Sequence, residues 1–403
     1  MHIVFVAPFL MEATLRFVRA AAKVPGVRLS LLSQDPVARV PRELGARLVA
    51  FRQVPDALDA GDIVAACVDL GRQVGPVTRL LGSLEQLQEP LALACEQLGL
   101  PGLGLDTARN FRDKARMKDV LRQHGLPCAA HQLALSAEQA REFARTCGFP
   151  LIVKPPAGAG AAGTHRLDDA ATLERYLASS PPRPEAPALF EEFLSGVEHS
   201  FDSIMVEGKL AWWSVSRYLP SPLTVLENPW IQWCVLLPRE LDGFADIRAA
   251  GESALAALGL VTGMTHMEWF RRQDGGLAIS EVAARPPGAQ FTSLLSYAHD
   301  ADFYAAWANL ACGQGFSAPP RRFAVGAAYV RGQGQGQVRA VHGLDEAERE
   351  LGALVVEARL PRRGERQGSG YEGAGHVIVR HADTAVVEQA LARIVRLVRV
   401  ELG

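Results

Sequence analysis

The sequence predicts an α/β protein that opens with a parallel sheet. The apolar run His2 to Ala7 has the length of a buried strand, and a helical pattern from Leu10 to Val24 follows it closely. The same alternation continues along the chain, which is typical of a parallel sheet covered by helices. The further strand-like segments are Arg28 to Ser33, Ala46 to Phe51 and Val77 to Gly82, with a helical stretch near Ile63 to Leu70.

Turn-forming residues divide the chain into three predicted domains. Residues 101–107, PGLGLDT, precede a long polar helix pattern over 108–124, which places a boundary between them. The central part mixes strands and helices as an α+β region, and its glycine-rich segment follows a strand. The predicted domains are 1–107, 108–320 with a lid subdomain at about 147–195, and a smaller α+β domain at 321–403.

Composition bounds the class of protein. With 403 residues, of which 48% are hydrophobic, the chain can bury a large core. Its formal net charge of −2 gives no global positive field for nucleic acid or for an anionic membrane surface. We therefore expect a soluble protein that acts on small molecules.

Cysteine usage and the first residues predict a cytoplasmic protein. The opening apolar run is short, lacks a basic leader and continues into Glu12 and Arg16, unlike a signal peptide. The six cysteines are too far apart in sequence for a zinc motif or a disulfide framework, so we expect reduced thiols. They are Cys67, Cys95, Cys128, Cys147, Cys234 and Cys312.

A glycine-rich loop follows a predicted strand. The segment from Lys154 to Thr164, KPPAGAGAAGT, combines glycines with small residues, so backbone amides can surround an anion such as a triphosphate. Lys154 would emerge at the strand end, where its ammonium could neutralise phosphate oxygens. The loop lacks the spacing of a P-loop or a dinucleotide fingerprint, so a surface turn and an ordinary lysine remain the alternatives.

Two glutamates end apolar strand patterns in a predicted hairpin. Glu268 in THMEWF and Glu281 in LAISEVAARPPG are separated by the turn RQDGG. The two carboxylates could therefore face each other and bind one or two magnesium ions together with nucleotide phosphates. Solvation at the surface is the alternative for either residue taken by itself.

Two further side chains near this hairpin are candidate catalytic groups. Arg285 follows Glu281 by four residues, and its planar guanidinium could hold a carboxylate or a transferring phosphoryl group. His266 lies two residues before Glu268 on the same strand face and could reach a reacting acyl phosphate or amine. A structural salt bridge for Arg285 and a hydrogen-bonded structural role for His266 are the alternatives.

The segment 212–233 concentrates four of the six tryptophans beside Arg217 and Tyr218. Such a segment could form a substrate wall with an apolar pocket. Aromatic core packing explains the same pattern equally well.

Five motifs in this order resemble the ATP-grasp superfamily, which includes biotin carboxylase, D-alanine ligases and L-amino acid ligases. They are Lys114, KPPAGAGAAGT, EEFLSGVE, HMEWF and EVAARPPG, and the similarity spans about residues 1–400. The resemblance implies an ATP-grasp fold with an N-terminal parallel-sheet domain, a central lid subdomain and a C-terminal domain.

The resemblance also implies a role for each matching residue in ATP binding. Lys114 and Lys154 would contact phosphates, Lys154 also near the adenine, and the glycine loop would close over them as a lid. Glu198 would hold the ribose hydroxyls. The loop residues are Gly158, Gly160, Gly163 and Thr164, and the adenine strand contributes Glu191, Phe193 and Leu194.

For the metal and the substrate, the resemblance assigns Glu268 and Glu281 to magnesium, with manganese as a substitute, and Arg285 to the carboxylate substrate. The chain departs from the pattern at two positions. Ala283 replaces an asparagine that normally supplies an oxygen ligand, and Ala161 replaces a common serine in the loop. These departures put full two-metal coordination and fast turnover in doubt.

Within the superfamily, the order of motifs most resembles the L-amino acid ligase branch and its carboxylase-like relatives. This implies a homodimer that joins an amino-acid-like carboxylate to an amine through an acyl phosphate. A carboxylase similar to biotin carboxylase or to purine-pathway relatives is one alternative. A nucleotide-binding regulatory protein with reduced catalysis, favoured by Ala161 and Ala283, is the other.

Overall fold

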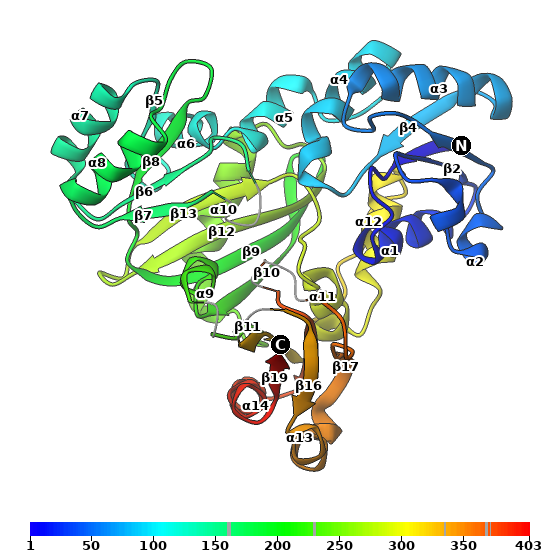
Figure 1. Ribbon diagram of the computed structural model, residues 1–403. Helices are drawn as coiled ribbons and strands as arrows, with labels where there is room; N and C mark the ends of the chain where they lie inside the picture. Colours follow the sequence, from blue (N-terminus) through cyan, green and yellow to red (C-terminus); the bar gives the residue numbers. More distant parts are fainter. Residues whose placement is uncertain (159–162, 229–230, 334–335, 367–369, 371) are drawn as a thin grey trace.

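The computed structural model describes the chain except residues 159–162, 229–230, 334–335, 367–369 and 371. It opens with a parallel sheet ordered β3-β2-β1-β4 (Figure 1). Ile3 and Phe5 of β1 pack with α1, whereas Val4 and Val6 pack with α3 and α4, so both faces are covered. This confirms the predicted α/β opening. Its elements are β1 (His2–Val6), α1 (Glu12–Ala21), β2 (Arg28–Ser33), α2 (Arg42–Gly45), β3 (Ala50–Gln53), α3 (Ala60–Val74), β4 (Val77–Leu81) and α4 (Gln88–Leu98).

The single helix predicted over 108–124 is wrong, because two helices, α5 (Leu105–Arg112) and α6 (Lys114–Gln123), occupy this region. Asp113 between them has extended backbone, with φ −90° and ψ 110°. Its carboxylate accepts hydrogen bonds from the backbone N–H groups of Ala115 and Arg116, at 2.9 and 3.1 Å. This N-cap starts α6 at Lys114 and so fixes the position of that lysine.

A four-stranded antiparallel sheet ordered β5-β8-β6-β7 spans residues 131–192 and overlaps the predicted lid subdomain at about 147–195. We call it the lid sheet, and with its helices the lid subdomain, while the movement of a lid stays a prediction. Helices α7 and α8 cover one face, where Leu151 and Val153 join the local core. Alternation along the strand turns Ile152 and Lys154 to the other face, which borders a cavity. The elements are β5 (His131–Ala134), α7 (Ala137–Cys147), β6 (Leu151–Lys154), β7 (His165–Leu167), α8 (Ala170–Ser179) and β8 (Ala188–Glu192).

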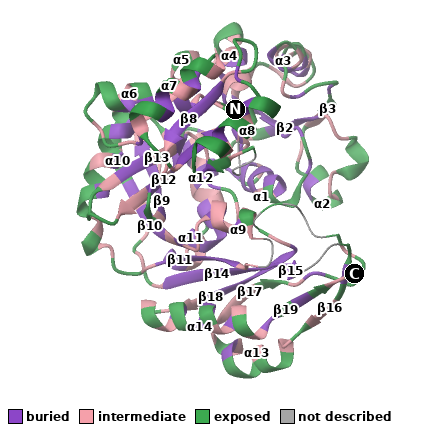
Figure 2. Cartoon of the chain, turned by 60° about the vertical axis from the view of Figure 1, so that its left-hand side comes forward, coloured by how far each residue is buried: buried purple, intermediate pink, exposed green. Residues whose placement is uncertain are grey.

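An eight-stranded antiparallel sheet forms the body of the molecule, in the order β13-β12-β9-β10-β11-β14-β18-β17. Its strands are largely buried (Figure 2). The strands are β9 (Gly196–Val206), β10 (Lys209–Leu219), β11 (Trp233–Leu237), β12 (Gly263–Arg272), β13 (Leu277–Ala283), β14 (Ala324–Val330), β17 (Val355–Arg359) and β18 (Gly375–His381).

Helices cover this sheet on both faces. Leu294 and Leu295 of α11 pack on one face of β11 and β14, and Leu391 of α14 packs on the other. At the β12 end, Met267 and Trp269 are buried against α6 and α10, which leaves the alternate residues of β12 facing the cavity. The helices are α9 (Pro222–Glu227), α10 (Ala245–Ala257), α11 (Phe291–His299), α12 (Phe303–Ala311), α13 (Leu344–Leu351) and α14 (Thr384–Leu397).

Within its described residues, the C-terminal segment contributes most of its strands to the large sheet and does not form a separate large sheet. After the predicted boundary at 320, β14, β17 and β18 complete the eight-stranded sheet, and only β15 (Gly332–Gln333), β16 (Val338–His342) and β19 (Arg399–Leu402) form a small sheet of their own. The division into domains at 107 and 320 stays a prediction.

The tryptophan-rich segment contributes mainly to the core. Trp212 and Trp233 are 6% and 1% exposed and belong to one apolar cluster, and Trp213 stacks on Phe201 at 5.8 Å. Trp233 also borders the cavity, and Trp230 lies outside the described residues. Core packing therefore accounts for Trp212 and Trp213, whereas Trp233 takes part in both the core and the cavity wall.

Among the described residues, no helix combines the length and apolar character that a membrane span requires. All six cysteines are free thiols, and Cys67, Cys95, Cys234 and Cys312 are buried.

Glu357 on β17 ties the N-terminal sheet to the large sheet. Its carboxylate lies 3.1 Å from Nη2 of Arg16 on α1 and 3.3 Å from Nε2 of His376, and accepts a hydrogen bond from the Tyr297 hydroxyl at 3.0 Å. The hydrogen bond with His376 and the Arg16 guanidinium outweigh desolvation and lower the pKa of Glu357 to about 2. The ionised form therefore joins α1 to two strands.

We predict that Glu357→Gln lowers the free energy of unfolding at pH 7 by roughly 1–3 kcal/mol, because a charged acceptor with three partners is lost. The folded pKa lies below the ordinary value of 4.5, so this stability is present above about pH 4.5 and is lost as the pH falls toward 2. Urea unfolding of both proteins across this range should show the difference shrinking. A difference independent of pH would contradict the assignment, and Glu185→Gln, at an exposed residue, serves as the control.

Candidate active site

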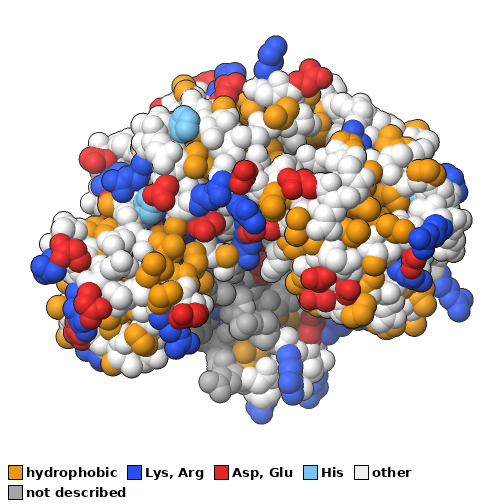
Figure 3. Space-filling view, turned by 90° about the horizontal axis from the view of Figure 1, so that it is seen from above, with side chains coloured by type: hydrophobic (Ala, Val, Ile, Leu, Met, Phe, Trp, Pro, Cys, Tyr) orange, Lys and Arg blue, Asp and Glu red, His pale blue; other side chains and the backbone are white. Residues whose placement is uncertain are grey.

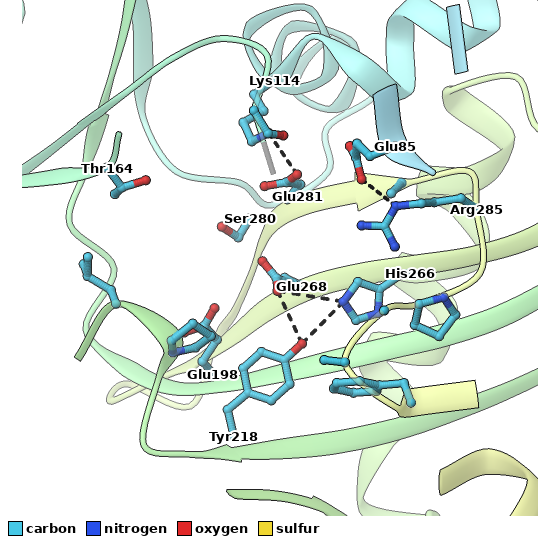
Figure 4. A pocket seen from close by; sticks show the side chains of 18 of the residues that line it. Glu85, Lys114, Thr164, Glu198, Tyr218, His266, Glu268, Ser280, Glu281 and Arg285 are labelled. Carbon is cyan, nitrogen blue, oxygen red and sulfur yellow. Dashed lines mark hydrogen bonds and ion pairs between the residues drawn. The ribbon is translucent and has the colours of Figure 1, made fainter. Parts of the chain in front are cut away.

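A cavity of about 380 Å³ lies where the N-terminal sheet, the lid subdomain and the large sheet meet. Seen from above, basic and acidic side chains gather in the hollow between the two upper lobes (Figure 3). The structure brings residues from distant segments to this one cavity (Figure 4). Those predicted from the sequence are Lys114, Lys154, Gly158, Thr164, Glu191, Phe193, Leu194, Glu198, His266, Glu268, Glu281 and Arg285.

Three carboxylates project into the cavity from neighbouring strands. Glu268 on β12 pairs directly with Glu281 on β13, as the hairpin pattern predicts. Glu198 on β9 lies opposite Phe270, two residues along the same face of β12. Burial, and then the neighbouring Glu268 charge, raise the pKa of Glu198 well above its ordinary value. Carboxylates that destabilise one another's charge provide a favourable place for a cation.

Lys114 meets these carboxylates from the start of α6. Its Nζ lies 2.9 Å from Oε1 of Glu281 and donates to the Gly158 carbonyl at 3.1 Å. Burial opposes ionisation of Glu281, but Lys114 and then Lys154 outweigh it and lower the pKa of this carboxyl. The lysine thus connects the start of the glycine loop to the acidic strand pair.

A second lysine of α6, Lys118, was not among the predicted site residues. It is fully buried, and its Nζ lies 3.5 Å from Oε1 of Glu191 and donates to the Ser280 carbonyl at 2.8 Å. Desolvation lowers the pKa of Lys118 despite the nearby carboxylate. Its spacing of four residues from Lys114 places both on one helix face, a signal that could have identified it.

Glu191 holds two lysines rather than standing open to a ligand. Besides Lys118, its carboxylate contacts Lys154 Nζ at 3.0 Å, and the residue is only 4% exposed. Burial opposes its charge, yet the two lysines keep its pKa below the ordinary value. The Glu191 side chain is therefore engaged by the two lysines, whereas Phe193 and Leu194, which follow β8, border the cavity.

His266 is fixed by a buried carboxylate that sequence patterns did not reveal. Its Nδ1 lies 2.7 Å from Oδ1 of Asp202, a residue with no exposed surface, and Ser200 donates to the other Asp202 oxygen at 2.8 Å. Nε2 points into the cavity, 3.4 Å from the Tyr218 hydroxyl and 3.8 Å from Glu268 (Figure 4). Burial opposes protonation of His266, but Asp202 outweighs it and raises the pKa to about 9.

Arg285 lies at the same cavity and is held by the N-terminal domain. Its Nε donates to Oε2 of Glu85 at 2.6 Å, and Nη1 donates to the Pro286 carbonyl at 2.9 Å. Glu85 is 4% exposed and also lies 3.7 Å from Arg112. The structural salt bridge considered as the alternative therefore exists, and it orients a guanidinium that still borders the cavity.

The glycine loop is described only at its ends. Gly158 and Thr164 border the cavity. Gly163 has a φ of +72°, and a Cβ there would lie 3.2 Å from the ring of Pro155, so glycine suits this position. Gly160 and Ala161 lie outside the described residues.

The donor set fits a metal that is shared with a ligand. The described residues hold no group of three or more histidine, cysteine, aspartate or glutamate side chains arranged to bind a metal. Glu268 and Glu281 provide two facing carboxylates, and Ala283, which borders the cavity, provides no oxygen ligand. Magnesium is often held by one or two carboxylates together with substrate phosphates, which this pair can supply.

One segment of the chain matches a family model, and the whole fold is similar to those of solved structures. Residues 113–204 match the family model of the carbamoyl-phosphate synthase L chain, ATP binding domain. The L-amino acid ligase from Bacillus licheniformis superposes with a TM-score of 0.80 at 18% identity, covering 100% of this chain and 98% of that one. The biotin carboxylase domain of Hydrogenobacter thermophilus 2-oxoglutarate carboxylase, in complex with MgADP and bicarbonate, gives a TM-score of 0.69 at 15% identity, covering 99% and 90%.

The chain therefore has the ATP-grasp fold, and its residues 113–204 resemble an ATP-binding domain of that superfamily. Among curated proteins it is similar to the L-arginine-specific L-amino acid ligase of Bacillus subtilis, 25% identical over 55% of each chain. It is also similar to the alanine–anticapsin ligase of Bacillus subtilis strain 168, 31% identical over 49% of this chain and 46% of that protein. The chain spans about half the length of the curated relatives it matches.

We predict that Glu191→Leu destabilises the protein by about 3–5 kcal/mol, because it leaves Lys118 and Lys154 buried without their shared carboxylate. Urea unfolding measures the change. Exposed Glu174→Gln in the same subdomain is the control, because the ion pair of Glu174 with Arg141 lies at the surface. A loss below about 1 kcal/mol for Glu191→Leu would show that the lysine cluster does not depend on this residue.

Proposed function

We propose that this protein is an ATP-dependent carboxylate–amine ligase that forms an amide bond and releases ADP and phosphate. One observation carries the proposal: Lys114, Lys154 and the facing pair Glu268 and Glu281 converge on one cavity beside Arg285. Cationic groups and metal-binding carboxylates placed side by side suit a metal-bound triphosphate, and the guanidinium suits a carboxylate.

The nucleotide would lie between the lid sheet and the large sheet. Phe193 and Leu194 would pack on the adenine, and Glu198 would accept hydrogen bonds from the ribose. Lys114 and Lys154 would contact the phosphates. The loop with Gly158, Gly160, Gly163 and Thr164 would cover them and exclude water from the reacting groups.

Glu268 and Glu281 would hold magnesium, for which manganese can substitute. When bound, the ion would neutralise part of the negative charge of the phosphates. Ala283 removes one oxygen ligand relative to the family pattern, so the nucleotide phosphates and water would complete the coordination.

In the proposed reaction a carboxylate oxygen of the substrate attacks the γ-phosphorus of ATP, and the bond to ADP breaks. The nitrogen of an amine then attacks the acyl carbon of the resulting acyl phosphate, loses a proton, and displaces phosphate. Arg285, oriented by Glu85, would position the carboxylate. His266, held by Asp202, would donate a hydrogen bond from Nε2 to the negative charge that develops.

Amino acids are the substrates we propose for both the acid and the amine. Support comes from the L-amino acid ligase and the alanine–anticapsin ligase, which are named for amino-acid substrates. The fold likeness to a biotin carboxylase domain bound to bicarbonate supports a second candidate, carboxylation through carboxyphosphate. The homodimer implied by the resemblance stays an expectation, as does the cytoplasmic location predicted from the cysteines and the first residues.

We predict that Glu281→Gln lowers phosphate release from magnesium ATP and amino acids by at least about a hundredfold, while the fold is retained. The change removes a negative charge that would bind the metal and partner Lys114. A phosphate-release assay with amino acids singly, in pairs, and with bicarbonate measures it, and Glu174→Gln should behave as wild type. Unchanged turnover of Glu281→Gln would remove the proposed site, whereas bicarbonate-dependent ADP release without an amine would favour the carboxylase.

A further inference from the structure

The part of the cavity near His266 is bordered by aromatic and apolar side chains, unlike the part around the lysines and the facing glutamates. Phe270, Glu268 and His266 alternate along one face of β12 and all border the cavity. Successive members of this row are roughly 7 Å apart, so the row gives the cavity a direction. It runs from Phe270, opposite Glu198, past the two facing glutamates, to His266.

Aromatic rings surround the end of this row. The Phe291 ring lies 5.3 Å from the His266 ring and 6.0 Å from the Tyr218 ring. Trp233 lies 5.4 Å from Tyr218 and 6.4 Å from Phe291. These distances describe one edge-packed group of rings, which is rigid and apolar toward its centre.

Helix α9 closes this aromatic group from the strand connection between β10 and β11. Pro222 and Leu223 border the cavity, and Leu223 is only partly buried. Two hydrogen bonds hold the described parts on either side of residues 229–230, because Arg331 Nη1 donates to the Val225 carbonyl at 2.7 Å and to the Ile231 carbonyl at 3.2 Å. Leu223 therefore presents an apolar side chain from a positioned segment.

The charges near this end oppose a basic ligand group. Arg285 borders the cavity, and its partner Glu85 is neutralised by Arg285 and Arg112, at 2.6 and 3.7 Å. Glu372 also borders the cavity but is an exposed residue. A cationic side chain placed among the rings would lose hydration, and the carboxylate beside the rings, Glu268 at 3.3 Å from the Tyr218 hydroxyl, is the one that the proposed metal would engage.

We propose, building on the ligase function above, that the carboxylate substrate carries an uncharged apolar side chain that packs between Leu223 and the rings of Tyr218 and Phe291. Its carboxylate would lie at Arg285, and Leu223 would set the size and polarity of the side chain that is accepted. The inference names a substrate class that the ligase proposal leaves open.

The test is a comparison of kcat/KM for phosphate release with magnesium ATP, one fixed amine and a panel of carboxylate donors. We expect leucine, methionine and phenylalanine to exceed lysine, arginine and glutamate by at least about tenfold. Leu223→Asp should lower the value for leucine by at least about tenfold and raise that for lysine. Leu223→Ala, a milder change, should shift the preference toward larger apolar donors.

Val261→Asp is the matched control, because Val261 is an apolar residue with 61% exposure that does not border the cavity. Faster release with charged donors, or an unchanged ranking in both Leu223 variants, overturns the inference while the ligase proposal stands. If wild type releases phosphate with no donor, the ligase proposal fails. Calorimetric titration of leucine and lysine in the presence of ATP then decides the inference: tighter leucine supports it, and equal or tighter lysine overturns it.

Discussion

The structure depends on opposite charges buried between facing sheets. A lysine or glutamate loses most of its hydration in such a place, so each charge requires a partner at short distance. Lys118 on α6 meets Glu191 of the lid strand β8 and the Ser280 carbonyl of β13. Lys154 meets the same Glu191 from β6. These contacts hold the lid sheet, α6 and the large sheet in one arrangement.

Charged residues at these contacts also take part in the proposed chemistry. Lys114 is paired with Glu281 and also holds the carbonyl of Gly158 at the start of the glycine loop. In the proposed function, a metal-bound triphosphate would separate the pair of Lys114 and Glu281. Glu281 would then bind the metal, and Lys114 would contact the phosphates. The strand pair, the lysine and the loop would then respond to the nucleotide together.

Local patterns in the sequence were sufficient for much of the fold. The strand and helix opening follows from apolar periodicity, and the hairpin that opposes Glu268 to Glu281 follows from its turn residues. The single helix over 108–124 was not correct, because a side-chain cap at Asp113 interrupts the pattern without changing its polarity. The pairing of β14 with β11 and β18 joins segments far apart in sequence and has no local signal.

The candidate site, like the fold, was predicted only in part from local patterns in the sequence. Lys118, Glu85 and Asp202 act through partners that are distant in the chain, namely Glu191, Arg285 and His266. The spacing of Lys118 from Lys114 could have placed both on one helix face, but no spacing rule identifies the partner of any of these three residues, because only the fold brings the partners together. Glu191 was assigned to adenine by resemblance, but its side chain is engaged by two lysines, a contact that only the three-dimensional arrangement reveals.

The most direct test of the central claim is a crystal structure with manganese and a non-hydrolysable ATP analogue, with anomalous scattering recorded to locate the metal. The account predicts a metal peak bridging the carboxylates of Glu268 and Glu281 and the analogue's phosphates, with Lys114 and Lys154 in contact with phosphate oxygens. A metal bound elsewhere, or a nucleotide outside the cavity between the lid and the large sheet, would contradict it.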